Sequence, residues 1–231
     1  IIIISMKSKR ITIICGHYGS GKTTFSINYA LYLRNQTSKD IYIADLDVVN
    51  PYFRSREHFD YLKDKNIKVI GSYLPQSGAD LPAVSAEVYT LFDNKNIIGI
   101  VDMGGNSAGS LSFATFRDNV DIEETDIIFI LNANREENST LEFALGHFNS
   151  IESTLGLKIT GIVNNTHLMN DTTIEDINKG ELISSELSKE KNIPVKFTCI
   201  NMDFFDNNPN IKTKYDLFLI GYDIKTVTNI I

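Results

Sequence analysis

Short apolar runs recur along the chain and alternate with segments whose apolar residues are spaced as on one face of a helix. Runs rich in Ile and Val and bounded by polar residues or glycine are typical of strands buried on both faces. Apolar residues three and four positions apart predict helices between those strands. The expected strands are 11–15, 41–44, 67–70, 97–101, 127–131, 159–163 and 195–200, and the expected helices are 24–33, 54–65, 85–92, 140–153 and 173–191.

This alternation predicts an α/β fold with a mostly parallel sheet of about seven strands and helices on both faces. In such a sheet, ligands bind at the carboxyl ends of the strands. The length of 231 residues suits one domain, which we place at residues 6–231. Residues 1–5 are interpreted as a cloning-derived or disordered extension, and residues 217–231 are expected to form a packed tail.

A glycine-rich segment stands between the first expected strand and the first expected helix. It reads Gly-His-Tyr-Gly-Ser-Gly-Lys-Thr and matches the phosphate-loop pattern G-x-x-x-x-G-K-[ST]. Its glycines allow backbone N–H groups and the helix N-terminus to point at phosphates. We expect Lys22 to reach the β- and γ-phosphates and the Thr23 hydroxyl to bind Mg²⁺. The residues expected to bind the nucleotide here are Gly16, His17, Tyr18, Gly19, Ser20, Gly21, Lys22, Thr23 and Thr24.

Carboxylates stand at the ends of two further expected strands. Asp102 follows the fourth strand, where a second Mg²⁺-organising carboxylate belongs, and Gly105 lets that loop approach the γ-phosphate. Asp45 and Asp47 follow the second strand, so one is expected near the metal while the other orients a water for attack on the γ-phosphorus. The alternatives are a helix cap for Asp102 and an Asp-rich turn for the pair.

Two asparagines, Asn164 and Asn165, follow the sixth expected strand. A side-chain amide there can read a base edge with its paired donor and acceptor. A guanine-reading N-K-x-D loop would have an Asp at the position of His167. Its absence favours adenine, and a β-turn role for the two asparagines is the alternative.

Charge and cysteine content narrow the possible partners. The formal net charge is −7, and no block of Lys and Arg stands out that would attract nucleic acid or an anionic membrane. No apolar run approaches the roughly 20 residues of a membrane-spanning helix, so stable membrane insertion is not expected. Cys15 and Cys199 lie in separate expected strands, which predicts reduced core thiols and a cytoplasmic protein.

In their order along the chain, these motifs resemble those of the CobQ/CobB and MinD/ParA-type nucleotide-binding proteins, the deviant Walker A ATPases. The resemblance spans roughly residues 10–200. It rests on the phosphate loop, on the Asp45-Leu46-Asp47 and Asp102-Met103-Gly104-Gly105 segments, and on the two asparagines. It implies a three-layer P-loop NTPase fold, Mg-ATP as the nucleotide and, in many members, a nucleotide-dependent homodimer.

Carried over by position, the resemblance also implies residue roles. Lys22 and Asp102 look like the phosphate-binding lysine and the Walker B carboxylate, and Asp47 looks like the carboxylate that helps to activate water. The implied metal-site residues are Thr23, Asp45 and Asp102, and Asn164 or Asn165 would contact adenine.

The phosphate loop departs from the family pattern at two positions. The family's early signature lysine, which can reach the partner's nucleotide across a dimer, is His17 here, and the next glycine is Tyr18. Histidine at its ordinary pKa of about 6.5 is mostly neutral near pH 7 and does not supply the fixed charge of lysine. A homodimer therefore remains an open possibility.

Three functions follow from these residues. The first, which we predict, is an ATPase switch that binds a protein partner and carries hydrolysis on Lys22, Asp47 and Asp102. The second is an ATP-dependent small-molecule kinase or ligase, similar to CobB and dethiobiotin synthetase, with an acceptor pocket near Arg54, Arg56 and residues 71–82. The third is a nucleotide sensor with negligible turnover.

Overall fold

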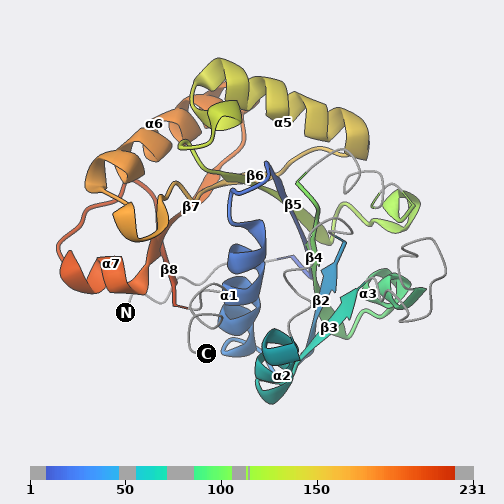
Figure 1. Ribbon diagram of the computed structural model, residues 1–231. Coiled ribbons are helices and arrows are strands. Elements are labelled where there is room, and N and C mark those ends of the chain that lie inside the picture. Colours follow the sequence, from blue (N-terminus) through green and yellow to red (C-terminus); the bar gives the residue numbers. More distant parts are fainter. Residues whose placement is uncertain (1–8, 47–55, 72–85, 106–112, 114, 222–231) are drawn as a thin grey trace, which may run out of the picture.

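The computed structural model describes residues 9–46, 56–71, 86–105, 113 and 115–221. The strands in this part of the chain form one eight-stranded sheet in the order β3-β2-β4-β1-β5-β6-β7-β8 (Figure 1). Every neighbouring pair of strands is parallel. The strands are β1 (Ile11–Gly16), β2 (Asp40–Asp45), β3 (Ile67–Gly71), β4 (Ile97–Asp102), β5 (Thr125–Leu131), β6 (Gly161–Asn164), β7 (Val195–Asn201) and β8 (Leu217–Ile220).

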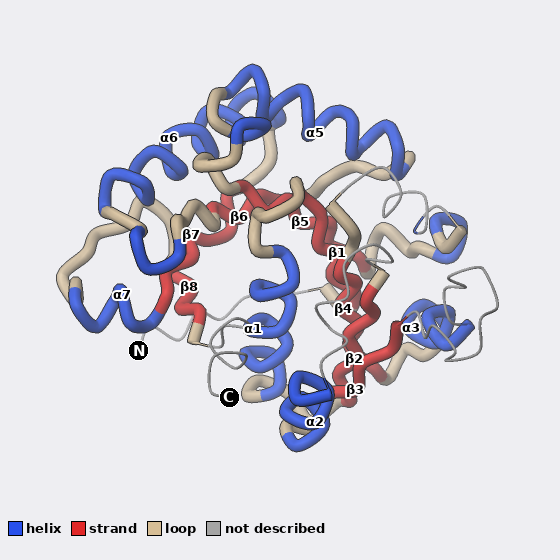
Figure 2. The backbone as a smooth tube through the Cα atoms, in the orientation of Figure 1, coloured by secondary structure: helices blue, strands red, loops and turns tan. Residues whose placement is uncertain are grey.

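Helices cover both faces of this curved sheet. Helix α1 lies against its concave face, and α5 and α6 lie on the outer face (Figures 1 and 2). The described α-helices are α1 (Lys22–Arg34), α2 (Arg56–Asp64), α3 (Tyr89–Asp93), α5 (Leu141–Leu155), α6 (Ile174–Lys191) and α7 (Met202–Asn207). Short 3₁₀ turns are η2 (Ala86–Val88), η3 (Arg117–Asn119), η4 (Glu136–Asn138) and η5 (Met169–Asp171). None of the described helices combines the length and apolar composition that a membrane crossing requires.

Two hydrophobic clusters hold the three layers together, one on each face of the sheet. In β1, Ile13 and Cys15 join the cluster that contains Phe148 of α5. Ile14, between them in sequence, joins the cluster around Phe25 of α1. Successive side chains of a strand point to opposite faces, so a strand covered by helices on both faces is apolar at consecutive positions.

The last strand corrects the expectation of a packed tail. Leu217 to Ile220 form β8, which pairs in parallel with β7 from Thr198↔Leu217 to Asn201↔Ile220. Phe218 and Ile220 are buried, and Leu219 between them is exposed. A run of four apolar residues is too short to distinguish an edge strand from a packed tail by its pattern. Residues 222–231 lie outside the described residues, as do residues 1–5.

A second expectation was only partly right. The helix expected at 85–92 is a 3₁₀ turn, η2, followed by the short helix α3. The helix expected at 54–65 is α2, and the described residues begin at its first residue.

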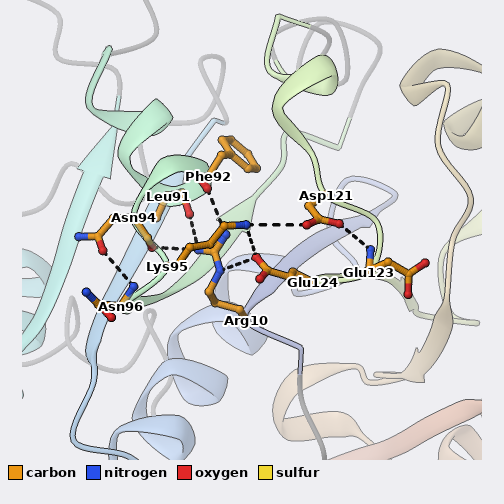
Figure 3. A network of polar contacts seen from close by, with 9 residues as sticks. All are labelled: Arg10, Leu91, Phe92, Asn94, Lys95, Asn96, Asp121, Glu123 and Glu124. Atoms are coloured by element: carbon orange, nitrogen blue, oxygen red, sulfur yellow. Dashed lines mark hydrogen bonds and ion pairs between the residues drawn. The ribbon is translucent and has the colours of Figure 1, made fainter.

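A polar network at the amino end of the sheet links β1 to the segments before β4 and β5 (Figure 3). Arg10 forms an ion pair with Glu124 (2.9 Å), and its guanidinium also donates to the carbonyl oxygens of Leu91 (2.6 Å) and Phe92 (3.2 Å). Lys95 donates to the same carboxylate at 2.6 Å. Hydrogen bonds from Lys95 and Arg10 hold the pKa of Glu124 below its ordinary value. This network leaves the opposite, carboxyl edge of the strands for the candidate site.

Candidate functional site

The glycine-rich loop follows β1 directly and leads into α1. Gly16, Gly19 and Gly21 have positive φ angles of 141°, 74° and 83°, a backbone region that side chains with a Cβ rarely adopt. The chain thereby turns back on itself, and Gly21 stands as the N-cap of α1. The predicted order of strand, loop and helix is present.

The N-terminus of α1 follows this loop, and no acidic side chain in its first turn offsets the positive end of the helix dipole. Lys22 is 6% exposed, and its Nζ donates to the carbonyl oxygen of His17 at 3.0 Å. Thr23 and Thr24 follow it in the same turn. The N–H groups of a first helical turn and a lysine side chain that meet in one place are an arrangement suited to binding an anion.

The structure brings together two of the predicted carboxylates, Asp45 and Asp102. They are the last residues of β2 and β4 and are direct neighbours in the parallel register. Ile43 and Ile100, two positions earlier in each strand, belong to the cluster around α1. Alternate residues share a face of the sheet, so both carboxylates face the layer of α1. Asp47 lies outside the described residues.

The loop after β4 packs directly on the phosphate loop. A Cβ built on Gly105 would lie 2.6 Å from the backbone nitrogen of Tyr18 and 2.7 Å from the Nζ of Lys22. Real Cβ atoms essentially never approach that closely, so only glycine permits this contact. The loop after β4 therefore lies against the phosphate loop, while the predicted approach of Gly105 to a γ-phosphate stays a prediction.

The two asparagines at the carboxyl end of β6 are both buried and both bonded to protein groups. The Nδ2 of Asn165 donates to the carbonyl oxygen of Ser20 at 2.7 Å. The Oδ1 of Asn164 accepts from the Thr166 hydroxyl at 2.7 Å, within its own loop. Asn165 thus supports the phosphate loop and Asn164 supports the loop after β6, while the predicted adenine contact stays a prediction.

A mainly apolar pocket opens beside the phosphate loop, at the carboxyl ends of β6 and β7. Thr24 of α1 forms one wall, and His167, Asn170 and Asn201 contribute polar groups. Phe204 of α7 supplies an aromatic ring. None of the described residues that line this pocket is Asp or Glu.

Residues of the loop that follows β5 also contact the phosphate loop, and no sequence motif pointed to them. Asn132 is fully buried and its Nδ2 donates to the carbonyl oxygens of His167 (3.3 Å) and Gly19 (3.5 Å). The Nε of Arg135 donates to the same Gly19 oxygen at 3.1 Å. These residues match no motif, but they follow a strand, and the rule that ligands bind at the carboxyl ends of strands would have pointed to them.

His17 lies between α5 and the turn η4. Its Nε2 is 3.3 Å from the Oε1 of Glu137, and its ring meets that of His147 edge-on with centroids 5.1 Å apart. Burial, and then the charges of His17 and Lys22, lower the pKa of His147 to about 4. His147 is therefore neutral at pH 7.

Both cysteines are free and buried, as expected. Burial raises the pKa of the Cys15 thiol to about 12, so it is not a thiolate near neutral pH. Much of the acceptor pocket suggested for a kinase or ligase, Arg54 and residues 72–82, lies outside the described residues.

No protein-family model matches this chain, and no curated protein matches it. Solved structures do. The cell division protein FtsY from Thermotoga maritima is 18% identical with a TM-score of 0.57, over 86% of this chain and 66% of that one. The signal recognition particle 54 kDa protein from Aeropyrum pernix, in complex with GDP, is 16% identical with a TM-score of 0.56, over 85% and 42%. FlhF complexed with GTP and Mg²⁺ is 15% identical with a TM-score of 0.50, over 81% and 64%.

At these identities the likeness establishes the fold. This chain has the single-domain α/β fold of P-loop NTPases, as the sequence predicted. It spans between 42% and 66% of the length of the three structures. The more specific resemblance to CobQ/CobB and MinD/ParA proteins is not confirmed by these similarities.

Proposed function

We propose that this chain binds Mg-ATP at the phosphate loop and hydrolyses it as a switch that acts on a protein partner. One observation carries the proposal. The loop, the N-terminus of α1 and the carboxylates of Asp45 and Asp102 lie at one edge of the sheet, with both carboxylates facing the α1 layer.

The phosphates would be bound by the backbone N–H groups of residues 19–23 and by Lys22. In the structure the Nζ of Lys22 is bonded to His17 within the loop. Exchanging that carbonyl oxygen for a phosphate oxygen gives the ammonium group a charged acceptor, and charge-assisted bonds are the stronger kind.

The donor set near the loop fits Mg²⁺. Thr23, Asp45 and Asp102 offer a hydroxyl and two carboxylates, the hard oxygen ligands that Mg²⁺ takes together with phosphates and waters. Bound Mg²⁺ would neutralise charge on the β- and γ-phosphate oxygens. The described residues hold no group of three or more His, Cys, Asp or Glu placed for a metal, and a site shared with a nucleotide does not need one.

For hydrolysis we propose that Asp47 orients the attacking water and that the loop of Gly105 responds to the γ-phosphate. Gly105 already lies against Tyr18 and Lys22. A γ-phosphate between these groups would exchange the direct loop contact for contacts through its oxygens. Release of phosphate would then let the direct contact form again, and such a rearrangement is how a nucleotide switch changes a partner-binding surface.

We propose adenine rather than guanine as the base. Guanine presents N–H donors on its Watson–Crick edge, which a carboxylate accepts well, and the described lining of the pocket contains none. The amide of Asn170, which lines it, offers a donor and an acceptor, as adenine requires. The GDP and GTP named for two of the similar structures make guanine nucleotides the necessary comparison.

The test is calorimetric titration of the wild type with ATP and with GTP, each with Mg²⁺, followed by assays of phosphate release. We expect ATP to bind more tightly than GTP. Lys22→Ala should weaken ATP binding by about ten- to hundredfold, because it removes a charge-assisted bond, and should abolish hydrolysis. Lys189→Ala, on the exposed last turn of α6, is the matched control and should behave as wild type.

Tighter binding of GTP would overturn the proposed base, and binding of neither nucleotide would overturn the proposal as a whole. We also propose that the protein is cytoplasmic and that a homodimer forms only with bound ATP. Light scattering with a non-hydrolysable analogue tests the dimer.

A further inference from the structure

An arginine outside every recognised motif contacts the phosphate loop from its outer side. The Nε of Arg135 donates to the carbonyl oxygen of Gly19 at 3.1 Å. A Cβ on Gly19 would lie 2.8 Å from the guanidinium carbon. The guanidinium group therefore lies against the middle of the loop, although Arg135 as a whole is an exposed residue.

The backbone of Arg135 is fixed by a turn that a buried asparagine organises. The Arg135 N–H donates to the carbonyl oxygen of Asn132 at 3.0 Å, and the Asn134 N–H donates to the Asn132 Oδ1 at 3.0 Å. The Arg135 carbonyl oxygen accepts from Asn138 at 2.9 Å. The side chain of an exposed arginine normally samples many conformations. Here, hydrogen bonds of the turn fix the backbone from which the Arg135 side chain extends.

The bond to Gly19 also fixes the direction of the next N–H group. In a trans peptide the C=O of one residue and the N–H of the next point in opposite directions. With the Gly19 oxygen held on the outer side by Arg135, the Ser20 N–H points into the loop, where it meets the His17 oxygen at 3.2 Å. That oxygen is also the acceptor of Lys22, so the Ser20 N–H and the lysine converge on one place.

We propose that Arg135 is a positioning residue for the nucleotide phosphates. It holds the Gly19 carbonyl outward and the Ser20 N–H inward, and its guanidinium adds positive charge beside the phosphate site. Asn165 acts in the same way on the peptide bond between Ser20 and Gly21, because its bond to the Ser20 oxygen directs the Gly21 N–H inward. The inference rests on the proposed nucleotide binding.

The proposal separates phosphate binding from base binding, and the experiment uses that separation. Affinities for ATP and adenosine are measured by competition with a fluorescent nucleotide for the wild type, Arg135→Gln and Arg135→Lys. Arg117→Gln, a half-exposed arginine in η3, is the matched control. Thermal unfolding of each variant checks the fold.

We expect Arg135→Gln to weaken ATP binding about three- to tenfold and to leave adenosine binding and the midpoint of unfolding unchanged. Arg135→Lys, which keeps the charge and a donor, should recover part of the loss, and Arg117→Gln should show none. An equal loss for ATP and adenosine, or unchanged ATP binding by Arg135→Gln, would overturn the inference. If the wild type itself binds no ATP, the proposed function fails instead.

Discussion

At the scale of single residues, the candidate site combines residues that belong to a motif with residues that the fold brings to the phosphate loop. Lys22 and the loop glycines belong to a contiguous motif whose chemistry dictates its spacing. Asp45 and Asp102 were identified because each ends an apolar strand. Arg135 acts through a backbone carbonyl, a role that any long donor can fill, so its residue type carries no signature.

Asn164 shows that the position of a residue at the end of a strand does not establish what its side chain contacts. Its position after a strand suggested contact with a base, but its Oδ1 accepts from the backbone N–H and the hydroxyl of Thr166, and its Nδ2 donates to Ile177. An amide side chain looks the same in sequence whether it serves a ligand or its own loop. The adjacent Asn165 crosses to the phosphate loop, a pairing 145 residues apart in sequence, which no local pattern reveals.

Gly105 gives a prediction at this scale. In Gly105→Ala the added methyl group would overlap Tyr18 and Lys22, so the loop must move off the phosphate loop. We expect weaker ATP binding and a free energy of unfolding lower by about 1–3 kcal/mol, measured by calorimetry and urea denaturation. Gly146→Ala in α5 is the control, because its Cβ would meet nothing within 4 Å. ATP binding by Gly105→Ala equal to that of the wild type would contradict a role for this contact.

At the scale of elements, the apolar strands were predictable because burial on both faces leaves a continuous signal. Short elements gave a weaker sequence signal. β8 is a four-residue strand with Leu219 exposed, and α3 contains only five residues. Helices α5 and α6 were predicted to within a few residues, and the structure shows that each begins with a threonine cap, Thr140 and Thr173.

The cap of α6 gives a prediction at this scale. Thr173 Oγ1 accepts from the Asp176 N–H at 3.2 Å, and Asp176 Oδ2 accepts from the Thr173 N–H at 2.9 Å. Thr173→Ala removes the first bond and should lower the free energy of unfolding by about 0.5–2 kcal/mol, measured by urea denaturation. Thr173→Ser keeps a hydroxyl and should restore most of it. Equal stability of the alanine variant and the wild type would show that the cap is not needed.

At the scale of the whole molecule, the two ends of the sheet have different tasks. The amino end is tied by the network around Arg10, and the carboxyl end carries the phosphate loop and its carboxylates. The division follows from parallel strands, which place all their carboxyl ends at one edge. The sequence therefore predicted where the site lies more fully than which side chains complete it.

The stability of the whole molecule should depend on His147 in acid. Its pKa is about 4 in the folded chain and about 6.5 when unfolded. Below pH 6.5 the unfolded chain binds a proton that the folded chain does not, so the free energy of unfolding falls as the pH approaches 4. At pH 5 we expect a loss of about 1 kcal/mol, reduced because the ring is partly exposed.

The measurement is urea denaturation of the wild type and His147→Gln at pH 7 and pH 5. The variant lacks the titrating ring, so the wild type should lose more stability than the variant between these two values. An identical loss in both proteins would rule out His147 as a source of the acid sensitivity.

The supports of the phosphate loop are unevenly distributed about β1. On the side of β5 and β6, Asn132, Arg135 and Asn165 bind its carbonyl oxygens through side chains. On the side of β4, the contact of Gly105 is one of backbone packing. Among the described residues, the β5–β6 side thus holds the phosphate loop through side-chain hydrogen bonds, and the β4 side touches it through the packing of Gly105. In the proposed switch, loss of the γ-phosphate would therefore displace the loop of Gly105 relative to a stationary β5–β6 side, and a partner that detects the nucleotide would have to contact both sides.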